Sequence, residues 1–98
     1  MGSIERIKEM ESILDECTGT VMQLEEALDR LDGVRERMGM LYEYYGSADW
    51  YDDREMELPE GMKAGVLSED LVYNNIMDTR DASFRMLKLA TDILKDKI

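Results

Sequence analysis

Apolar side chains recur in steps of three and four residues along the first half of the chain. An α-helix has about 3.6 residues per turn, so this spacing places them on one stripe of a single helix. The stripe consists of Ile7, Met10, Leu14, Cys17, Val21, Leu24, Leu28, Leu31, Arg35, Met38, Tyr42 and Tyr45. A neighbouring row widens it with Ile13, Thr20, Ala27, Val34 and Leu41. The pattern predicts a long helix over residues 4–45, and its width favours a helical bundle over a two-stranded coiled coil.

Two glycines bear on the limits of this helix. Gly19 lies between two threonines and weakens a helix interior by about 1 kcal/mol. The apolar steps keep their phase across it, so we expect the helix to continue. A break at Gly19 would instead allow three helices to close a monomeric bundle. Gly46 can adopt the left-handed conformation that often ends a helix, and we expect the helix to end there.

A second long helix is predicted over residues 69–97. Ser68 is suited to cap its N-terminus, and Glu69 and Asp70 place negative charge where the helix macrodipole is positive. The apolar stripe of this helix consists of Tyr73, Met77, Arg80, Phe84, Leu87, Thr91, Leu94 and Ile98, and a neighbouring row of Ile76, Ser83 and Ala90 broadens it. Between the two helices, the sequence predicts an irregular connection over residues 47–67, because Pro59 interrupts regular structure. A short helix is expected within this connection.

The expected fold is therefore all-α: one domain over residues 1–98, arranged as a long antiparallel helical hairpin with an irregular connection. The first helix is longer than the second by roughly ten residues, or about 15 Å. Part of its apolar stripe, near Ile7 to Leu14, then has no partner within the hairpin. A second copy could cover it, which predicts a homodimer of the four-helix-bundle type.

Charge and composition narrow the possible functions. The formal net charge is −11, so the surface repels phosphate backbones and anionic leaflets, and we expect neither nucleic acid nor membrane as a partner. A basic protein is allowed. Histidine is absent and Cys17 is the one cysteine, which removes Ser-His-Asp and Cys-His catalysis and most zinc sites. We expect no cofactor, no metal and no enzymatic activity. No signal peptide or bilayer-spanning run is evident, so the expected location is cytoplasmic.

An aromatic cluster with interleaved carboxylates occupies "YEYYGSADWYDDRE", residues 42–55. One interpretation is structural: the rings pack as a cap at the closed end of the hairpin, with Trp50 folded over Tyr42 and Tyr45. The other is a binding site for a cation or another small molecule, formed by the same three rings and Asp53. The structural interpretation is the more common one for such clusters.

Two arginines occupy apolar stripes, Arg35 on the first helix and Arg80 on the second. In a hairpin that places residue 45 beside about residue 70, they would lie in one layer. We expect an internal ion network with Asp32 and Asp81 as counter-charges. Side chains that extend to solvent are a second interpretation, and an anion pocket between the two guanidinium groups is a third.

Several motifs resemble those of a bacterial family catalogued as domain of unknown function 4298. They are "YYGS", "WYDD" and "LPEGMKAGVLSED", together with the opening "RIKEMESILDE". The positions that match the family pattern are Tyr44, Tyr45, Gly46, Ser47, Trp50, Asp53, Gly65 and Ser68. The resemblance implies a small cytoplasmic helical protein and brings no assigned activity. Together with the composition, it favours a non-enzymatic interaction or self-associating module, with a small-molecule or cation-binding domain, or a weak enzyme, as the alternative.

Overall fold

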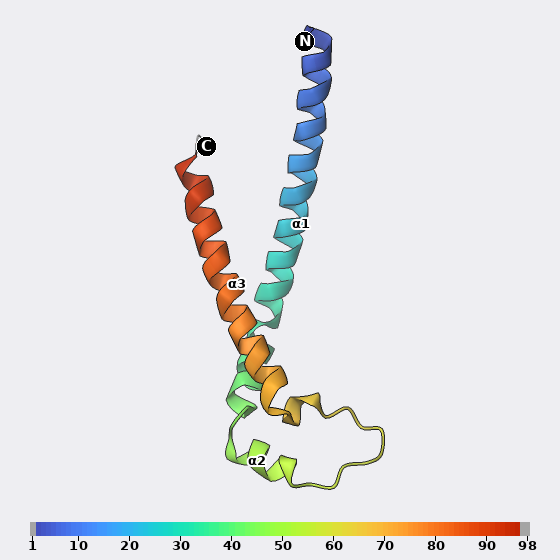
Figure 1. The fold of residues 1–98 in the computed structure, drawn as a ribbon, viewed down its shortest axis with the longest axis vertical. Helices are drawn as coiled ribbons and strands as arrows, with labels where there is room; N and C mark the ends of the chain where they lie inside the picture. Colours follow the sequence, from blue (N-terminus) through green and yellow to red (C-terminus); the bar gives the residue numbers. More distant parts are fainter. Residues whose placement is uncertain (1, 97–98) are drawn as a thin grey trace. The chain divides into compact units, whose positions relative to one another are not determined.

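The computed structural model describes residues 2–96, and within that range every regular element is helical (Figure 1). The order is α1 (Ser3–Tyr44), α2 (Ala48–Arg54), a single 3-10 turn η1 (Gly65–Leu67) and α3 (Glu69–Lys95). The all-α class predicted from the hydrophobic pattern is confirmed. The predicted end of the last helix at residue 97, and the stripe position Ile98, lie outside the described residues.

Helix α1 is continuous through Gly19 over its 42 residues, or about 63 Å. Next to this glycine, the Thr20 hydroxyl donates to the Glu16 carbonyl at 2.8 Å, as threonines in helices commonly do. The helix ends because Gly46 has a φ of +78°, which a residue with a Cβ rarely adopts. The Ser47 amide then donates back to the Tyr44 carbonyl at 3.0 Å.

Helices α2 and α3 both begin at a serine cap. The Ser47 hydroxyl accepts a hydrogen bond from the Trp50 amide at 3.2 Å and begins α2. The Ser68 hydroxyl accepts one from the Leu71 amide at 3.1 Å and begins α3, as the sequence predicts. Each bond satisfies a backbone N–H that has no partner inside the helix.

The chain divides between Arg37 and Met38 into two compact units. The N-terminal unit is a single length of α1 and contains no second element that could cover its apolar stripe. Accordingly, Ile7, Met10, Leu14, Val21, Leu24 and Leu28 are each between 41% and 57% exposed. The C-terminal unit contains the last turns of α1 together with α2, η1 and α3. Its best-buried side chains are Trp50 and Val72, which are 3% and 4% exposed.

Within the C-terminal unit, the last turns of α1 contact the first turns of α3. The Tyr45 hydroxyl donates to the Glu69 carbonyl at 2.8 Å, which agrees with the expected placement of residue 45 beside about residue 70. One turn earlier, the Tyr42 hydroxyl donates to Asn75 Oδ1 at 2.6 Å and lies 3.0 Å from Thr79 Oγ1. Residue numbers fall along α1 as they rise along α3, so these turns run antiparallel.

The packed face of α3 lies along one edge of the predicted stripe. Val72 is buried, and Ile76, Met77 and Thr79 are half-buried, so Met77 of the predicted stripe and Ile76 of its broadening row are partly covered. The stripe residue Tyr73 is exposed, and Val72, about 100° from it on the helix, was not in the predicted stripe. The reason is that α3 has apolar side chains on two adjacent faces, and the longer row dominates the sequence pattern.

Candidate functional site

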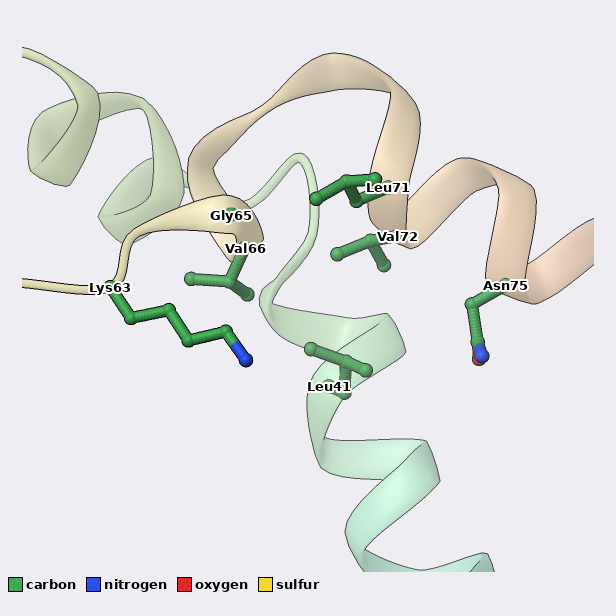
Figure 2. Close-up of a pocket in the computed structure, with 7 residues that line it drawn as sticks. All are labelled: Leu41, Lys63, Gly65, Val66, Leu71, Val72 and Asn75. Atoms are coloured by element: carbon green, nitrogen blue, oxygen red, sulfur yellow. The ribbon is translucent and has the colours of Figure 1, made fainter.

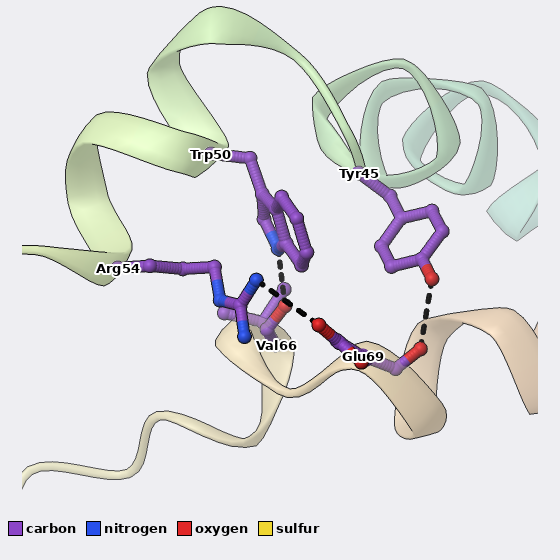
Figure 3. Close-up of polar contacts among 5 residues, drawn as sticks. All are labelled: Tyr45, Trp50, Arg54, Val66 and Glu69. Atoms are coloured by element: carbon purple, nitrogen blue, oxygen red, sulfur yellow. Dashed lines mark hydrogen bonds and ion pairs between the residues drawn. The ribbon is translucent and has the colours of Figure 1, made fainter.

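The indole of Trp50 is the centre of the aromatic cluster. Helix α2 places it against the ring of Tyr45, with centroids 5.1 Å apart, and against Tyr51, with centroids 5.0 Å apart, both in edge-on geometry. Its Nε1 donates to the Val66 carbonyl of η1 at 3.0 Å, so the polar atom of a nearly buried ring is satisfied (Figure 3). The predicted burial of Trp50 on Tyr45 is confirmed.

An arginine that sequence reasoning did not single out covers this ring. The guanidinium carbon of Arg54 lies 4.5 Å from the Trp50 ring centroid, within the range of a cation–π interaction. Arg54 Nη1 also lies 3.5 Å from Glu69 Oε1 at the start of α3 (Figure 3). We call Tyr45, Trp50, Arg54, Val66 and Glu69 the Trp50 clasp. Its contacts tie α2 and η1 to the ends of α1 and α3.

A hollow of about 230 Å³ borders the clasp and is lined by Tyr45, Gly46, Trp50, Tyr51, Arg54 and Glu69. It combines aromatic edges with one cation and one carboxylate. The cation of Arg54 already occupies a position over the indole, so a cationic ligand would have to displace it. The binding-site interpretation of this cluster stays a prediction.

The other two predicted site residues lie in separate contacts. Asp53 Oδ2 accepts a hydrogen bond from the Tyr44 hydroxyl at 2.6 Å. This bond, and secondarily desolvation and the nearby negative charge, raise the pKa of Tyr44 to about 12. Tyr42 does not contact Trp50 in the way the sequence predicts but bonds to α3 instead. Of the four predicted residues, Tyr45 and Trp50 pack ring against ring, whereas Tyr42 and Asp53 hydrogen-bond to other residues.

A second, more apolar hollow was not predicted. It has a volume of about 390 Å³ and lies where the end of α1, η1 and the start of α3 meet (Figure 2). Its lining residues are Leu41, Lys63, Gly65, Val66, Leu71, Val72 and Asn75. A Cβ on Gly65 would lie 2.8 Å from the Leu71 Cδ1 atom, so a larger residue there would require the Leu71 side chain to move. The sequence signal was Gly65, which follows an irregular stretch and lies three residues before the Ser68 cap.

The two stripe arginines make local contacts. Arg35 Nη1 lies 3.2 Å from Asp32 Oδ1 one turn away, with side chains that are 73% and 77% exposed. Arg80 lies over the Phe84 ring, 5.5 Å from its centroid, and no ion pair with Asp81 is present between residues 2 and 96. The predicted Asp32 pair is therefore present, but at the surface of its unit, and the Asp81 pair is wrong. A common layer for the two arginines, and an anion pocket between them, stay predictions.

Residues 2–96 contain neither a cluster of candidate metal ligands nor a helix suited to span a membrane. Over residues 2–96, no group of three or more candidate metal ligands clusters. None of the helices described there combines the length and the apolar character needed to cross a bilayer.

Comparison with known protein families identifies the family of this chain. The family model of DUF4298, described as a domain of unknown function, matches residues 7–89. The chain belongs to this family. The match spans all of α1 except its first four residues, the Trp50 clasp and most of α3, so the DUF4298 domain contains the helices described above. No curated protein matches the chain.

Proposed function

We propose that this DUF4298 protein is a non-enzymatic helical interaction module, and that its first partner is a second copy of itself. The proposal rests on the unequal lengths of its two long helices. Helix α1 has 42 residues and α3 has 27, so α1 is longer by 15 residues, or about 22 Å. Wherever α3 lies along α1, at least that length of α1 has no partner within the described chain.

The apolar stripe runs along the whole of α1, so any uncovered length exposes large side chains. In the first turns these are Ile4, Ile7, Met10, Ile13 and Leu14, all of which are exposed. Burying one such side chain fully contributes about 1.5–3 kcal/mol, and monomeric proteins rarely expose a long contiguous apolar row. Association of two antiparallel hairpins into a four-helix bundle would cover it.

The alternative, a small-molecule or cation-binding domain, has the hollow beside Trp50 in its favour. Against it, Arg54 and Glu69 already satisfy the ring face and each other. The clasp residues are better explained as the contacts that hold a long connection in place. We further propose a cytoplasmic location, because the single cysteine allows no internal disulfide. We propose a basic protein as any additional partner, because the net charge is −11.

Sedimentation equilibrium at micromolar concentration tests the proposal. We expect the parent to be a dimer and Leu14→Lys to shift it towards monomer. Ser12→Lys is the matched control, because it adds the same charge on the face of α1 opposite the stripe, and it should remain dimeric. A parent that sediments as a monomer at every concentration would overturn self-association.

A further inference from the structure

We infer that each copy places the N-terminal part of its α1 on the second apolar face of the partner's α3. This face, the outer face of α3, consists of Tyr73, Arg80, Phe84, Leu87, Thr91 and Leu94. The inference rests on the proposed self-association and specifies which surfaces meet. It predicts contacts of α1 with α3, and not of α1 with α1 or of α3 with α3.

The first observation is that α3 has more apolar surface than its own unit uses. Val72, Ile76 and Thr79 face the end of α1, and this row is buried or half-buried. On the outer face, Tyr73, Phe84, Leu87 and Leu94 are between 52% and 76% exposed. A helix with two adjacent apolar faces needs covering on two sides, as in the interior of a bundle.

The second observation is charge complementarity between two stretches of equal length. Residues 79–95 of α3 contain four basic and two acidic side chains, a net charge of +2. Residues 3–19 of α1 contain two basic and five acidic side chains, a net charge of −3. Pairing α1 with α1, or α3 with α3, would bring like charges together, whereas the crossed arrangement brings opposite charges together and disfavours the alternatives.

The third argument is the area available. Two-fold symmetry makes the α1–α3 contact twice, so both faces of both copies are used. With Ile7, Met10 and Leu14 against Phe84, Leu87 and Leu94, twelve large side chains take part in all. At roughly 60–120 Å² each they remove about 700–1,400 Å² of apolar surface. With flanking polar atoms, this reaches the size of a stable interface, about 1,200 Å² or more.

The single cysteine allows a direct test, because Cys17 lies on the α1 stripe and is exposed. One chain keeps Cys17. A second, tagged chain is Cys17→Ser and has one new cysteine on the outer face, in turn Phe84→Cys, Leu87→Cys, Thr91→Cys and Leu94→Cys. The two are mixed, oxidised mildly and separated on a non-reducing gel. We expect a disulfide between the unlike chains at one or two of these positions.

The matched control is Met62→Cys in the Cys17→Ser chain, since Met62 lies in the connection and is as exposed as Phe84. It should give no disulfide above background. In parallel, Leu87→Lys should raise the dimer dissociation constant at least tenfold and Met62→Lys should leave it unchanged, with helix content equal by circular dichroism. A dimer whose only disulfide joins Cys17 to Cys17 would overturn the crossed arrangement and leave self-association standing. A monomeric parent would overturn both.

Discussion

The stretch of α1 from residue 3 to 37 and the Trp50 clasp are both rich in large apolar or aromatic side chains, but they use them differently. In the clasp, the rings of Tyr45 and Trp50 pack edge-on, and their polar atoms donate to the backbone carbonyls of Glu69 and Val66. In the α1 stretch, the apolar row has no second element in its own unit. The rings and polar atoms of the clasp have their partners within one unit of the chain. The apolar row of α1 can be covered only by residues outside its own unit.

The difference bears on the two interpretations that the sequence leaves open. Aromatic and charged residues concentrated near a turn attract attention as a binding site, and in the clasp they also link the connection to the ends of α1 and α3. The regular apolar row of α1 has the pattern of ordinary core, but it has no partner within its own unit. Under the proposed self-association, this exposed row is where the molecule makes contacts.

The largest effect should come from removing the centre of the clasp. Trp50→Ala should lower the free energy of unfolding by about 3–5 kcal/mol, because it deletes a buried ring and strands the Val66 carbonyl. Urea unfolding at fixed protein concentration measures it. The neighbour Tyr51→Ala is the control and should cost much less, since Tyr51 is mostly exposed. Equal losses in the two variants would mean that the clasp is no more structural than the surface around it.

A smaller effect should distinguish the end of α1 from its interior. Gly46→Ala should destabilise by about 1–2 kcal/mol, because alanine must adopt a φ of +78°. Gly33→Ala should instead stabilise by about 0.5–1 kcal/mol, because Gly33 lies inside α1 with nothing within 4 Å of the added Cβ. Thermal melts of both variants measure the two shifts, and shifts of the same sign would contradict the assignment of Gly46 as the helix terminator.

The effect of the Tyr44–Asp53 hydrogen bond on the pH dependence of stability should be seen only at alkaline pH. The folded-state pKa of Tyr44, about 12, is above its ordinary value of 10, so the stability it contributes is fully present below about pH 10. That contribution is lost as pH rises towards 12. Tyr44→Phe should therefore flatten the fall in the urea midpoint above pH 10.

Asp53→Ala provides the partner control for that measurement. It should flatten the same region, and the double variant should show no further change, because both substitutions remove the same hydrogen bond. Additive effects of the two substitutions would show that Tyr44 and Asp53 act separately.

The smallest effects are expected at the arginines. Arg35→Met and Arg80→Met should each change stability by no more than about 0.5 kcal/mol, because the Arg35–Asp32 pair is exposed and Arg80 is an exposed side chain over the Phe84 ring. Sulfate at matched ionic strength should leave every melting temperature unchanged. A rise in the parent that either variant abolishes would instead reveal an anion pocket formed by both residues.

Much of the local structure could be predicted, because it depends on neighbours in the sequence. The continuity of α1, its termination at Gly46 and the cap at Ser68 follow from periodicity, backbone preference and a hydroxyl at the right distance from the next amides. The packed face of α3 was predicted only in part: Ile76 and Met77 were included, whereas the most buried residue, Val72, was not. Two adjacent apolar rows are both compatible with a helix, and the periodicity alone does not decide which one packs.

The same limit applies to the clasp. Burial of Trp50 follows from its size and from the nearby tyrosines. Its partners are harder to predict from the sequence. Val66 and Glu69 follow the irregular segment, and Arg54 is one charged residue within an acidic run. Tyr42 and Asp53 likewise have other partners: Tyr42 bonds to Asn75, and Asp53 accepts from Tyr44. These partners depend on the side of α1 from which Tyr42 and Tyr44 project.

The bond from Tyr45 to Glu69 also has a kinetic consequence. It joins residues 24 positions apart, and the Trp50–Val66 bond within the same loop joins residues 16 apart. Closing such a loop costs little more chain entropy than closing a shorter one. The Tyr42 bonds to Asn75 and Thr79 and the Arg54–Glu69 pair join the same segments, and most of the remaining contacts in the C-terminal unit are local helix. A chain with so few distant pairings should fold within microseconds to milliseconds. Any slower phase should then depend on protein concentration, as a bimolecular step does, and its rate would report directly on the encounter of two chains.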